Sequence, residues 1–187
     1  MADQGDPGDA FFPYEKGCIL NFLECTTEDG RMPINISPDN IFPAAETEKV
    51  ENIHKPCLAQ HAAFIIEANG GESKWLKPHV PRLKAYLSYY RCHMFHEKTG
   101  HYFWVDDTAI GVDNDPSTFY RPDKSSASIY LNCLMYKELL AMAFVCKKLE
   151  FPFSEYEKQA EELKKAVQEN LWDGRNGFYY SADLNLK

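Results

Sequence analysis

Hydrophobic and polar positions alternate with a helical period in five segments of the chain. Apolar side chains three or four residues apart share one face of an α-helix, so each segment predicts a helix. A proline suits a first helical turn and serine suits an N-cap, which places three of the starts at Pro56, Ser73 and Ser154. The expected helices cover residues 14–25, 56–68, 73–90, 126–149 and 154–172.

The expected helices are of two kinds. Those at 56–68 and 126–149 are apolar around most of their circumference, which predicts burial on nearly all sides. The helix at 154–172 carries a single apolar stripe, made of Tyr156, Ala160, Leu163, Val167 and Leu171. Its other face is charged, and lysine neighbours make a solvated surface the expected role of Glu157, Glu161, Glu162 and Glu169.

A glycine turn recurs after the first, third and fifth helices, at Gly30, Gly100 and Gly177, which are 70 and 77 residues apart. One buried and one amphipathic helix per period predicts stacked helical hairpins. We expect about three units, at residues 10–55, 56–125 and 126–187. The pattern suits an open α-solenoid or a closed double ring of helices, and the long irregular links favour the ring.

Composition narrows the class of protein. The chain has 187 residues, of which 44% are hydrophobic and 14% aromatic, and this excludes intrinsic disorder. No uninterrupted apolar run approaches the roughly 18–20 residues that span a bilayer, and the acidic start has no signal-peptide pattern, so no membrane partner is expected. The net charge is −8 and no basic stripe is present, so nucleic acid is not an expected partner.

The six cysteines include no C-x-x-C pair, and we interpret them as reduced, buried thiols. Free thiols and the missing signal peptide weakly favour a cytoplasmic location. Cys92, His93, His96 and His101 offer a zinc alternative, but lone histidines at a helix end are more often solvated, so no metal site is expected. No dinucleotide or phosphate-loop fingerprint occurs, and no cofactor is expected.

An aspartate-rich link at residues 104–123 carries the strongest chemical signal. It holds five carboxylates and three aromatic rings, namely Asp106, Asp107, Asp113, Asp115, Asp123, Trp104, Phe119 and Tyr120. Carboxylates bind sugar hydroxyls, and a glycosidase needs a carboxylic acid to protonate the departing oxygen. Asp113, between Gly111 and Asn114, is the best candidate. A calcium loop and an acidic surface loop remain open, although the distal glutamate of an EF-hand is missing.

The order of these motifs resembles glycoside hydrolase family 63 and its mannosylglycerate-hydrolase-like relatives. The resemblance rests on Gly111-Val-Asp-Asn-Asp-Pro116, on Ser128-Ile-Tyr-Leu-Asn132, on His54-Lys-Pro-Cys-Leu-Ala-Gln60 and on Leu171-Trp-Asp173, and it covers residues 31–183. It implies an all-α (α/α)6 toroid, of which this chain holds about three of six hairpins. It also implies inverting hydrolysis of an α-glycosidic bond, with Asp113 as general acid and the base a later glutamate outside this chain.

The resemblance also suggests sugar-binding residues, which are Trp104, Asn114, Arg121, Gln60, Asn132 and Tyr136. The family often has arginine at the position of Ser117, and Arg121 takes over that role in our hypothesis. Core packing is the alternative for Trp104, and a bond to a neighbouring loop is the alternative for Gln60. Asn132 and Tyr136 share one helix face and either meet the sugar or hold the aspartate-rich link.

The leading hypothesis is therefore part of an inverting glycosidase for an α-linked glucoside or mannoside. A non-catalytic carbohydrate-binding module and a helical-repeat interaction scaffold are the alternatives. The expected partner is a carbohydrate. If three hairpins of a six-hairpin ring are present, an apolar flank should stay exposed where the next hairpin packs.

Overall fold

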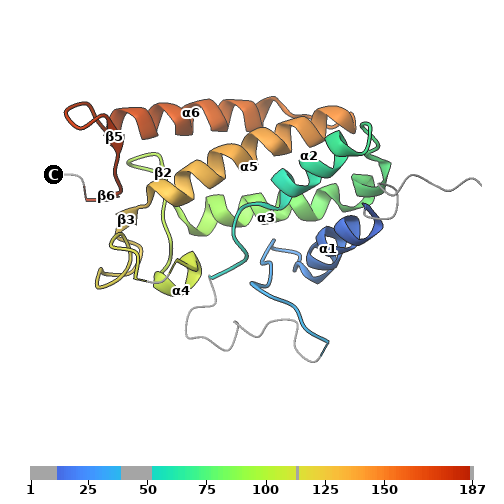
Figure 1. Ribbon diagram of the computed structural model, residues 1–187, viewed down its shortest axis with the longest axis horizontal. Helices are drawn as coiled ribbons and strands as arrows, with labels where there is room; N and C mark the ends of the chain where they lie inside the picture. Colours follow the sequence, from blue (N-terminus) through green and yellow to red (C-terminus); the bar gives the residue numbers. More distant parts are fainter. Residues whose placement is uncertain (1–11, 39–51, 113, 186–187) are drawn as a thin grey trace, which may run out of the picture.

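A computed structural model describes residues 12–38, 52–112 and 114–185 (Figure 1). Helices dominate it, as expected for an all-α fold. The long helices are α1 (Phe12–Cys25), α2 (Leu58–Ala68), α3 (Val80–His93), α5 (Ile129–Lys148) and α6 (Ser154–Asn170). Two short elements are the 3₁₀-helix η2 (Lys74–His79) and α4 (Asp107–Ile110).

Three two-stranded antiparallel pairs connect the helices. β1 (Phe95–His96) pairs with β2 (His101–Tyr102), and β4 (Trp172–Asp173) pairs with β5 (Phe178–Tyr179). β3 (Ser126–Ala127) pairs with the distant β6 (Ala182–Asp183). The first two pairs are the glycine turns that the sequence predicts after the third and fifth helices, and the third brings the two ends of the α5–α6 unit together.

The centre of the molecule is α5, which packs on α6 along one side and on α2 along another (Figure 1). Residues of α2, α3, α5 and α6 join one hydrophobic cluster. Its largest fully buried side chains include Tyr86, Tyr90, Tyr102, Met94 and Ile66. Helical hairpins that pack around a buried helix fit part of an (α/α)-barrel, as the sequence predicts. The unit boundaries at 10–55, 56–125 and 126–187 stay a prediction.

Helix starts differ from the expected ones for local reasons. Ser126 belongs to β3, so α5 begins three residues later and is capped by Ser128, whose Oγ accepts from the Leu131 N–H at 3.5 Å. Ser73 precedes a 3₁₀-helix that contains Pro78, and its side chain forms no capping bond. Ser154 is the first residue of α6 rather than its cap. The sequence pattern located these helices, and the turn chemistry set their ends.

Burial on nearly all sides was expected for the two apolar helices, and each of them leaves one side open. Tyr130 and Leu140 of α5 are 37% and 42% exposed, and Phe64 of α2 is 70% exposed. A groove of about 440 Å³ follows this side of α5, with Ile129, Cys133, Tyr136, Lys137, Val167 and Tyr179 among its walls. An apolar flank is therefore open, as the hypothesis of an interrupted ring requires.

By length and composition alone, α5 is long and apolar enough to cross a membrane. Among residues 12–38, 52–112 and 114–185, no other helix is. Half of its most apolar stretch is buried inside the protein. It also holds Glu138, which has no exposed surface and binds the start of α2. These contacts are those of the core helix of a folded domain.

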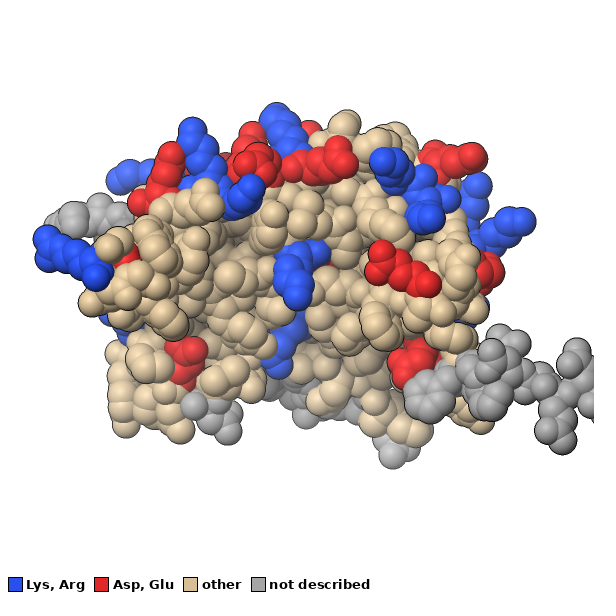
Figure 2. All heavy atoms as spheres, turned by 45° about the horizontal axis from the view of Figure 1, so that its top comes forward, with Lys and Arg blue, Asp and Glu red and all other residues tan. Residues whose placement is uncertain are grey.

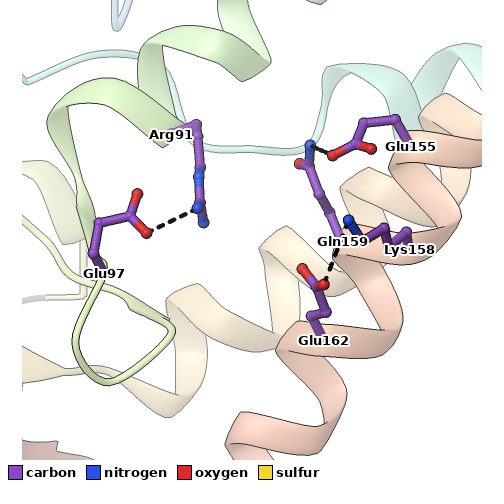
Figure 3. A network of polar contacts seen from close by, with 6 residues as sticks. All are labelled: Arg91, Glu97, Glu155, Lys158, Gln159 and Glu162. Atoms are coloured by element: carbon purple, nitrogen blue, oxygen red, sulfur yellow. Dashed lines mark hydrogen bonds and ion pairs between the residues drawn. The ribbon is translucent and has the colours of Figure 1, made fainter.

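The outer face of α6 is solvated, as its charge pattern predicts. Lys158 lies 3.9 Å from Glu162, one turn away, and Glu155 accepts from the Gln159 amide at 3.0 Å (Figure 3). On the neighbouring helix α3, Arg91 pairs with Glu97 at 3.0 Å (Figure 3). Acidic and basic side chains alternate along the upper edge of Figure 2, above a largely uncharged face. Such exposed pairs contribute about 0–1 kcal/mol each, so they add solubility more than stability.

All six cysteines carry free thiols. Burial was expected for them, and this is wrong for Cys18, Cys92 and Cys133, which are exposed. Only Cys146 is fully buried. Apolar neighbours in the sequence placed these thiols on helices, but they did not show which side of the helix would be covered.

Candidate active-site loop

The aspartate-rich link is a closed loop whose two ends meet. Phe103 forms a β-bridge with Ala127, and the Lys124 N–H donates to the Val105 carbonyl at 3.1 Å. The Leu184 N–H donates to the Ser125 carbonyl at 2.8 Å, so the strand after α6 also holds the base of the loop. Loops with fixed ends and a free tip are common carriers of functional residues.

The first turn of the loop is the short helix α4, which Asp106 caps. Its carboxylate accepts from the N–H groups of Thr108 and Ala109 at 2.9 and 3.3 Å, and from the Asn52 amide at 2.9 Å. Gly111 ends α4 in the left-handed region, at φ 61°. Asp113, the predicted acid, lies outside the described residues.

The second turn of the loop uses two further carboxylates. Asp115 accepts from the Ser117 N–H at 2.7 Å, and Asp107 accepts from the Thr118 hydroxyl at 2.5 Å. Together with Asp106, three carboxylates of the loop therefore hold its own backbone in place. Among the described residues, no three histidine, cysteine or acidic side chains gather as metal ligands.

Backbone strain is concentrated in this loop. Asn114, Tyr120 and Lys124 have φ values of 61°, 61° and 57°, in the left-handed region that residues other than glycine rarely adopt. Glu150 is the one further case among the described residues. Strained residues persist where surrounding contacts force them, and they cluster at functional sites.

The segment before α2 lies against this loop and is held by two tyrosines of α3. The hydroxyl of Tyr90 donates to the His54 carbonyl at 2.7 Å, and that of Tyr86 donates to the Lys55 carbonyl at 2.6 Å. Burial raises the pKa of both tyrosines well above the usual value, so both remain donors. The Lys55 ammonium then lies directly beside Gly111, where a Cβ would collide with it.

A buried carboxylate fixes the first turn of α2. Glu138 of α5 has no exposed surface and accepts from the N–H groups of Ala59 and Gln60 at 2.7 and 3.2 Å. The Gln60 amide donates to the same carboxylate at 3.1 Å. Burial raises the pKa of Glu138 to about 7, against the lowering effect of these hydrogen bonds. Sequence reasoning missed Glu138, because it is one charge in an otherwise ordinary helical pattern, and Lys55, because it lies in the link before α2.

The predicted sugar-binding residues fall into two groups. Asn132 and Trp104 are buried, at 0% and 2% exposure, and support the loop from inside. The Asn132 side chain accepts from the Tyr102 N–H and donates to the Tyr102 carbonyl, both at 2.8 Å. Gln60 donates to Glu138, which lies on helix α5 and not on the neighbouring loop that the alternative named. These side chains position the strand and helix beside the loop.

The other predicted residues lie on the surface around the loop. Asn114 is exposed, and Arg121 pairs with Asp183 at 3.6 Å. Tyr136 lines the groove along α5 rather than the loop. A second groove of about 370 Å³ lies beside the loop, and its walls include Asp115, Arg121, Ser126, Tyr179, Tyr180 and Ser181. Tyrosine rings, hydroxyls, a carboxylate and a guanidinium around one hollow suit a polar, hydroxyl-rich ligand.

The zinc alternative finds no support in the geometry. The His93 ring stacks on Tyr89, with 4.2 Å between ring centroids, and the His96 Nδ1 lies 2.9 Å from the Thr99 hydroxyl. His101 is buried, and Cys92 is exposed. The four side chains therefore do not converge on one point.

Asn132 gives a direct test of how the loop is anchored. Asn132→Ala leaves the buried N–H and carbonyl of Tyr102 without partners, and we expect the free energy of unfolding to fall by about 2–4 kcal/mol. Tyr136→Phe, one turn further along α5, is the matched control and should cost less than about 1 kcal/mol. Denaturant unfolding measures both variants, and equal losses would contradict the assigned role.

Gly111 gives a second test, of the contact between the loop and Lys55. Gly111→Ala strains a left-handed residue by about 1–2 kcal/mol and also displaces the Lys55 ammonium. Gly177→Ala is matched, because its φ is 64° and a Cβ there meets no atom. We expect similar losses of stability but at least a tenfold loss of turnover only in the Gly111 variant, measured in the full-length enzyme. Equal turnover in the two variants would exclude a functional role for the contact.

Helical hairpins and an acidic, strained loop before a core helix are the features expected of a glycosidase of the helical-barrel class. The family model described as "Mannosylglycerate hydrolase MGH1-like glycoside hydrolase domain" matches residues 21–186, and the chain belongs to this family of glycoside hydrolases. The chain is also 26% identical to the cytosolic neutral trehalase of Kluyveromyces lactis over 127 residues. That match covers 61% of this chain and 17% of the trehalase. No solved structure matches the chain.

Proposed function

We propose that this domain hydrolyses an α-linked glucoside or mannoside with inversion, and that Asp113 is the general acid. The acid protonates the departing glycosidic oxygen while a second carboxylate activates water on the opposite face of the sugar. That base is a glutamate outside residues 1–187. Because the chain spans only 17% of the trehalase that it matches, the reaction is that of the full-length protein.

The architecture of the loop supports this assignment most strongly. Asp106, Asp107 and Asp115 use their carboxylates in hydrogen bonds within the fold. Gly111 and Asn114, on either side of position 113, are both left-handed. Two left-handed residues this close together mark a tight turn in this part of the loop, and the family places its acid in this motif.

The groove beside the loop is the proposed sugar site. Arg121 offers a charged partner for hydroxyl groups, and Tyr180 offers an aromatic face. Asn114 supplies an amide at the loop tip. We assign Trp104, Asn132 and Gln60 to support of the loop, because their burial and hydrogen bonds point into the fold.

The stereochemistry of the product tests the proposed mechanism. Proton NMR of the full-length enzyme acting on an α-glycoside should show the β-anomer of the released sugar first, before mutarotation. Appearance of the α-anomer first would mean retention and would overturn the mechanism. Sugar binding by calorimetry without any release would instead support the non-catalytic carbohydrate-binding alternative.

A further inference from the structure

The segment before α2, residues 52–57, contacts both ends of the short helix α4 in the aspartate-rich loop. The Asn52 amide donates at 2.9 Å to the carboxylate of Asp106, the residue that caps the start of α4. The Lys55 ammonium lies against Gly111, the residue that ends α4. Because one short segment makes both contacts, a shift of this segment changes the position of α4 as a whole.

The segment depends on other elements for its own position, since residues 52–57 belong to no helix or strand. The His54 carbonyl accepts from the hydroxyls of Tyr86 and Tyr90 at 2.8 and 2.7 Å. The His54 N–H donates to the Met32 carbonyl at 3.2 Å. These bonds hold the middle of the segment. Its end runs into the first turn of α2, so the group that orients this turn also orients the segment.

The first turn of α2 is not capped by its own N-cap residue. An N-cap side chain normally accepts from the N–H groups of the second and third helical residues, here Ala59 and Gln60. The side chain of Cys57, the N-cap residue, makes no such bond. Instead, the Glu138 carboxylate of α5 accepts from both N–H groups, at 2.7 and 3.2 Å. A side chain from another helix therefore supplies the missing cap.

Glu138 also reaches the segment itself through Gln60. The Gln60 amide donates to the Glu138 carboxylate at 3.1 Å and to the Pro56 carbonyl at 2.9 Å. Burial raises the pKa of Glu138 to about 7, so the fold opposes ionisation of this group. A serine at position 57 would cap the turn without a buried charge. The cap from α5 adds what a local cap lacks, which is a fixed position of the turn relative to α5.

The same helix also anchors the strand that leads into the loop, because Asn132 of α5 binds the backbone of Tyr102 in β2. We propose that Glu138 is a positioning residue for the loop. It fixes the first turn of α2, and the segment before α2 transmits that position to both ends of α4. The consequence for turnover rests on the proposed function, whereas the consequence for the order of α4 does not.

Amide hydrogen exchange in the full-length protein tests the coupling without reference to catalysis. At pH 8, where the wild-type carboxyl with its pKa of about 7 is ionised, Glu138→Gln removes the charge and keeps the size of the side chain. The Ala109 amide, bonded to Asp106 at 3.3 Å, should then exchange at least about tenfold faster. Glu161→Gln makes the same chemical change on the solvated face of α6 and should have no effect. Unchanged exchange at Ala109 in Glu138→Gln would overturn the proposal, and so would an equal acceleration at Tyr102, because α5 itself would then have loosened.

Turnover of the full-length enzyme at the same pH tests whether the position of α4 matters for the reaction. A misplaced acid costs most where the leaving group needs a proton, and a displacement of about 1 Å can cost roughly 10²-fold. Glu138→Gln should therefore lower kcat at least about tenfold on an alkyl α-glycoside and less than about threefold on an aryl α-glycoside with an acidic phenol, with KM unchanged. A merely structural role would reduce both rates by the same factor.

Asp113→Asn, assayed in parallel on both substrates, separates this proposal from the proposed function. A selective loss in Asp113→Asn with equal losses in Glu138→Gln would overturn the positioning role alone. Equal losses in both variants would overturn the proposed function, and the exchange of the Ala109 amide would then decide by itself whether Glu138 positions α4.

Discussion

Replacing Asp113 by Asn is expected to lower turnover of the full-length enzyme about 10³-fold on natural glycosides, while the domain still folds. An amide has no acidic proton to give, and positioned general acids contribute roughly 10²–10⁴-fold to rate. Because the substitution leaves the size of the side chain almost unchanged, we expect KM to change little and kcat to carry the loss. Steady-state kinetics on an α-linked disaccharide measure the effect.

Asp115→Asn is the matched control for this variant. Asp115 accepts a bond from the Ser117 N–H at 2.7 Å, and an asparagine oxygen can accept the same bond. Turnover of the control should stay within about tenfold of the wild type, since the turn is kept and no catalytic proton is lost. If the control loses as much activity as the Asp113 variant, general acidity of the loop tip is not the explanation.

Removing the Glu138 carboxylate is expected to cause a larger loss of stability than either Asn132→Ala or Gly111→Ala. Glu138→Ala leaves the N–H groups of Ala59 and Gln60 without this acceptor, removes one of the acceptors of the Gln60 amide, and opens a cavity in the core. Both effects together should lower the free energy of unfolding by about 3–5 kcal/mol. Glu161→Ala, on the solvated face of α6, is the control and should change it by less than about 0.5 kcal/mol.

The raised pKa of Glu138 also predicts a dependence of stability on pH. A carboxyl whose pKa rises from 4.5 to about 7 on folding binds its proton more tightly in the folded state. Its contribution is therefore complete below pH 4.5 and is lost as the pH rises through 7. With 1.36 kcal/mol per pKa unit, the loss from this group is roughly 3 kcal/mol between pH 4.5 and 8.

Two histidines, His101, which is buried, and His54, which is half-buried, change stability with pH in the opposite direction, so their effect must be separated from that of Glu138. Burial lowers the pKa of His54 and His101, so folding favours their neutral forms, and their contribution is lost as the pH falls below 6.5. Unfolding curves of the wild type and of Glu138→Gln, compared at each pH, isolate the carboxyl. The difference should change by a few kcal/mol across this range, and a constant difference would contradict the assigned pKa.

Hydrophobic periodicity predicted the helices well because it reports which faces are buried. The stripe of α6 and the length of α5 followed directly from it. It could not predict that α5 and α2 each leave one side open. An apolar helix face gives the same sequence pattern whether or not other residues of the described structure pack on it. Phe64, expected to be buried and 70% exposed, is the clearest case.

The loop was predicted as a site, but the roles within it were not separable from the sequence. Asp106 caps α4 and Asp115 closes a turn, and composition gives all loop carboxylates the same weight. Lys55 and Glu138 were missed for a different reason. They meet the loop and the start of α2 through tertiary contacts between distant segments, and no local motif indicates such contacts.

In the proposed mechanism, Asp113 donates a proton to the departing oxygen. The dependence of the rate on the leaving group tests this step directly. A glycoside with a highly acidic phenol as leaving group needs no proton, whereas an alkyl glycoside does. We expect Asp113→Asn to retain turnover within about tenfold on the activated substrate and to lose about 10³-fold on the alkyl glycoside. An equal loss on both substrates would contradict it.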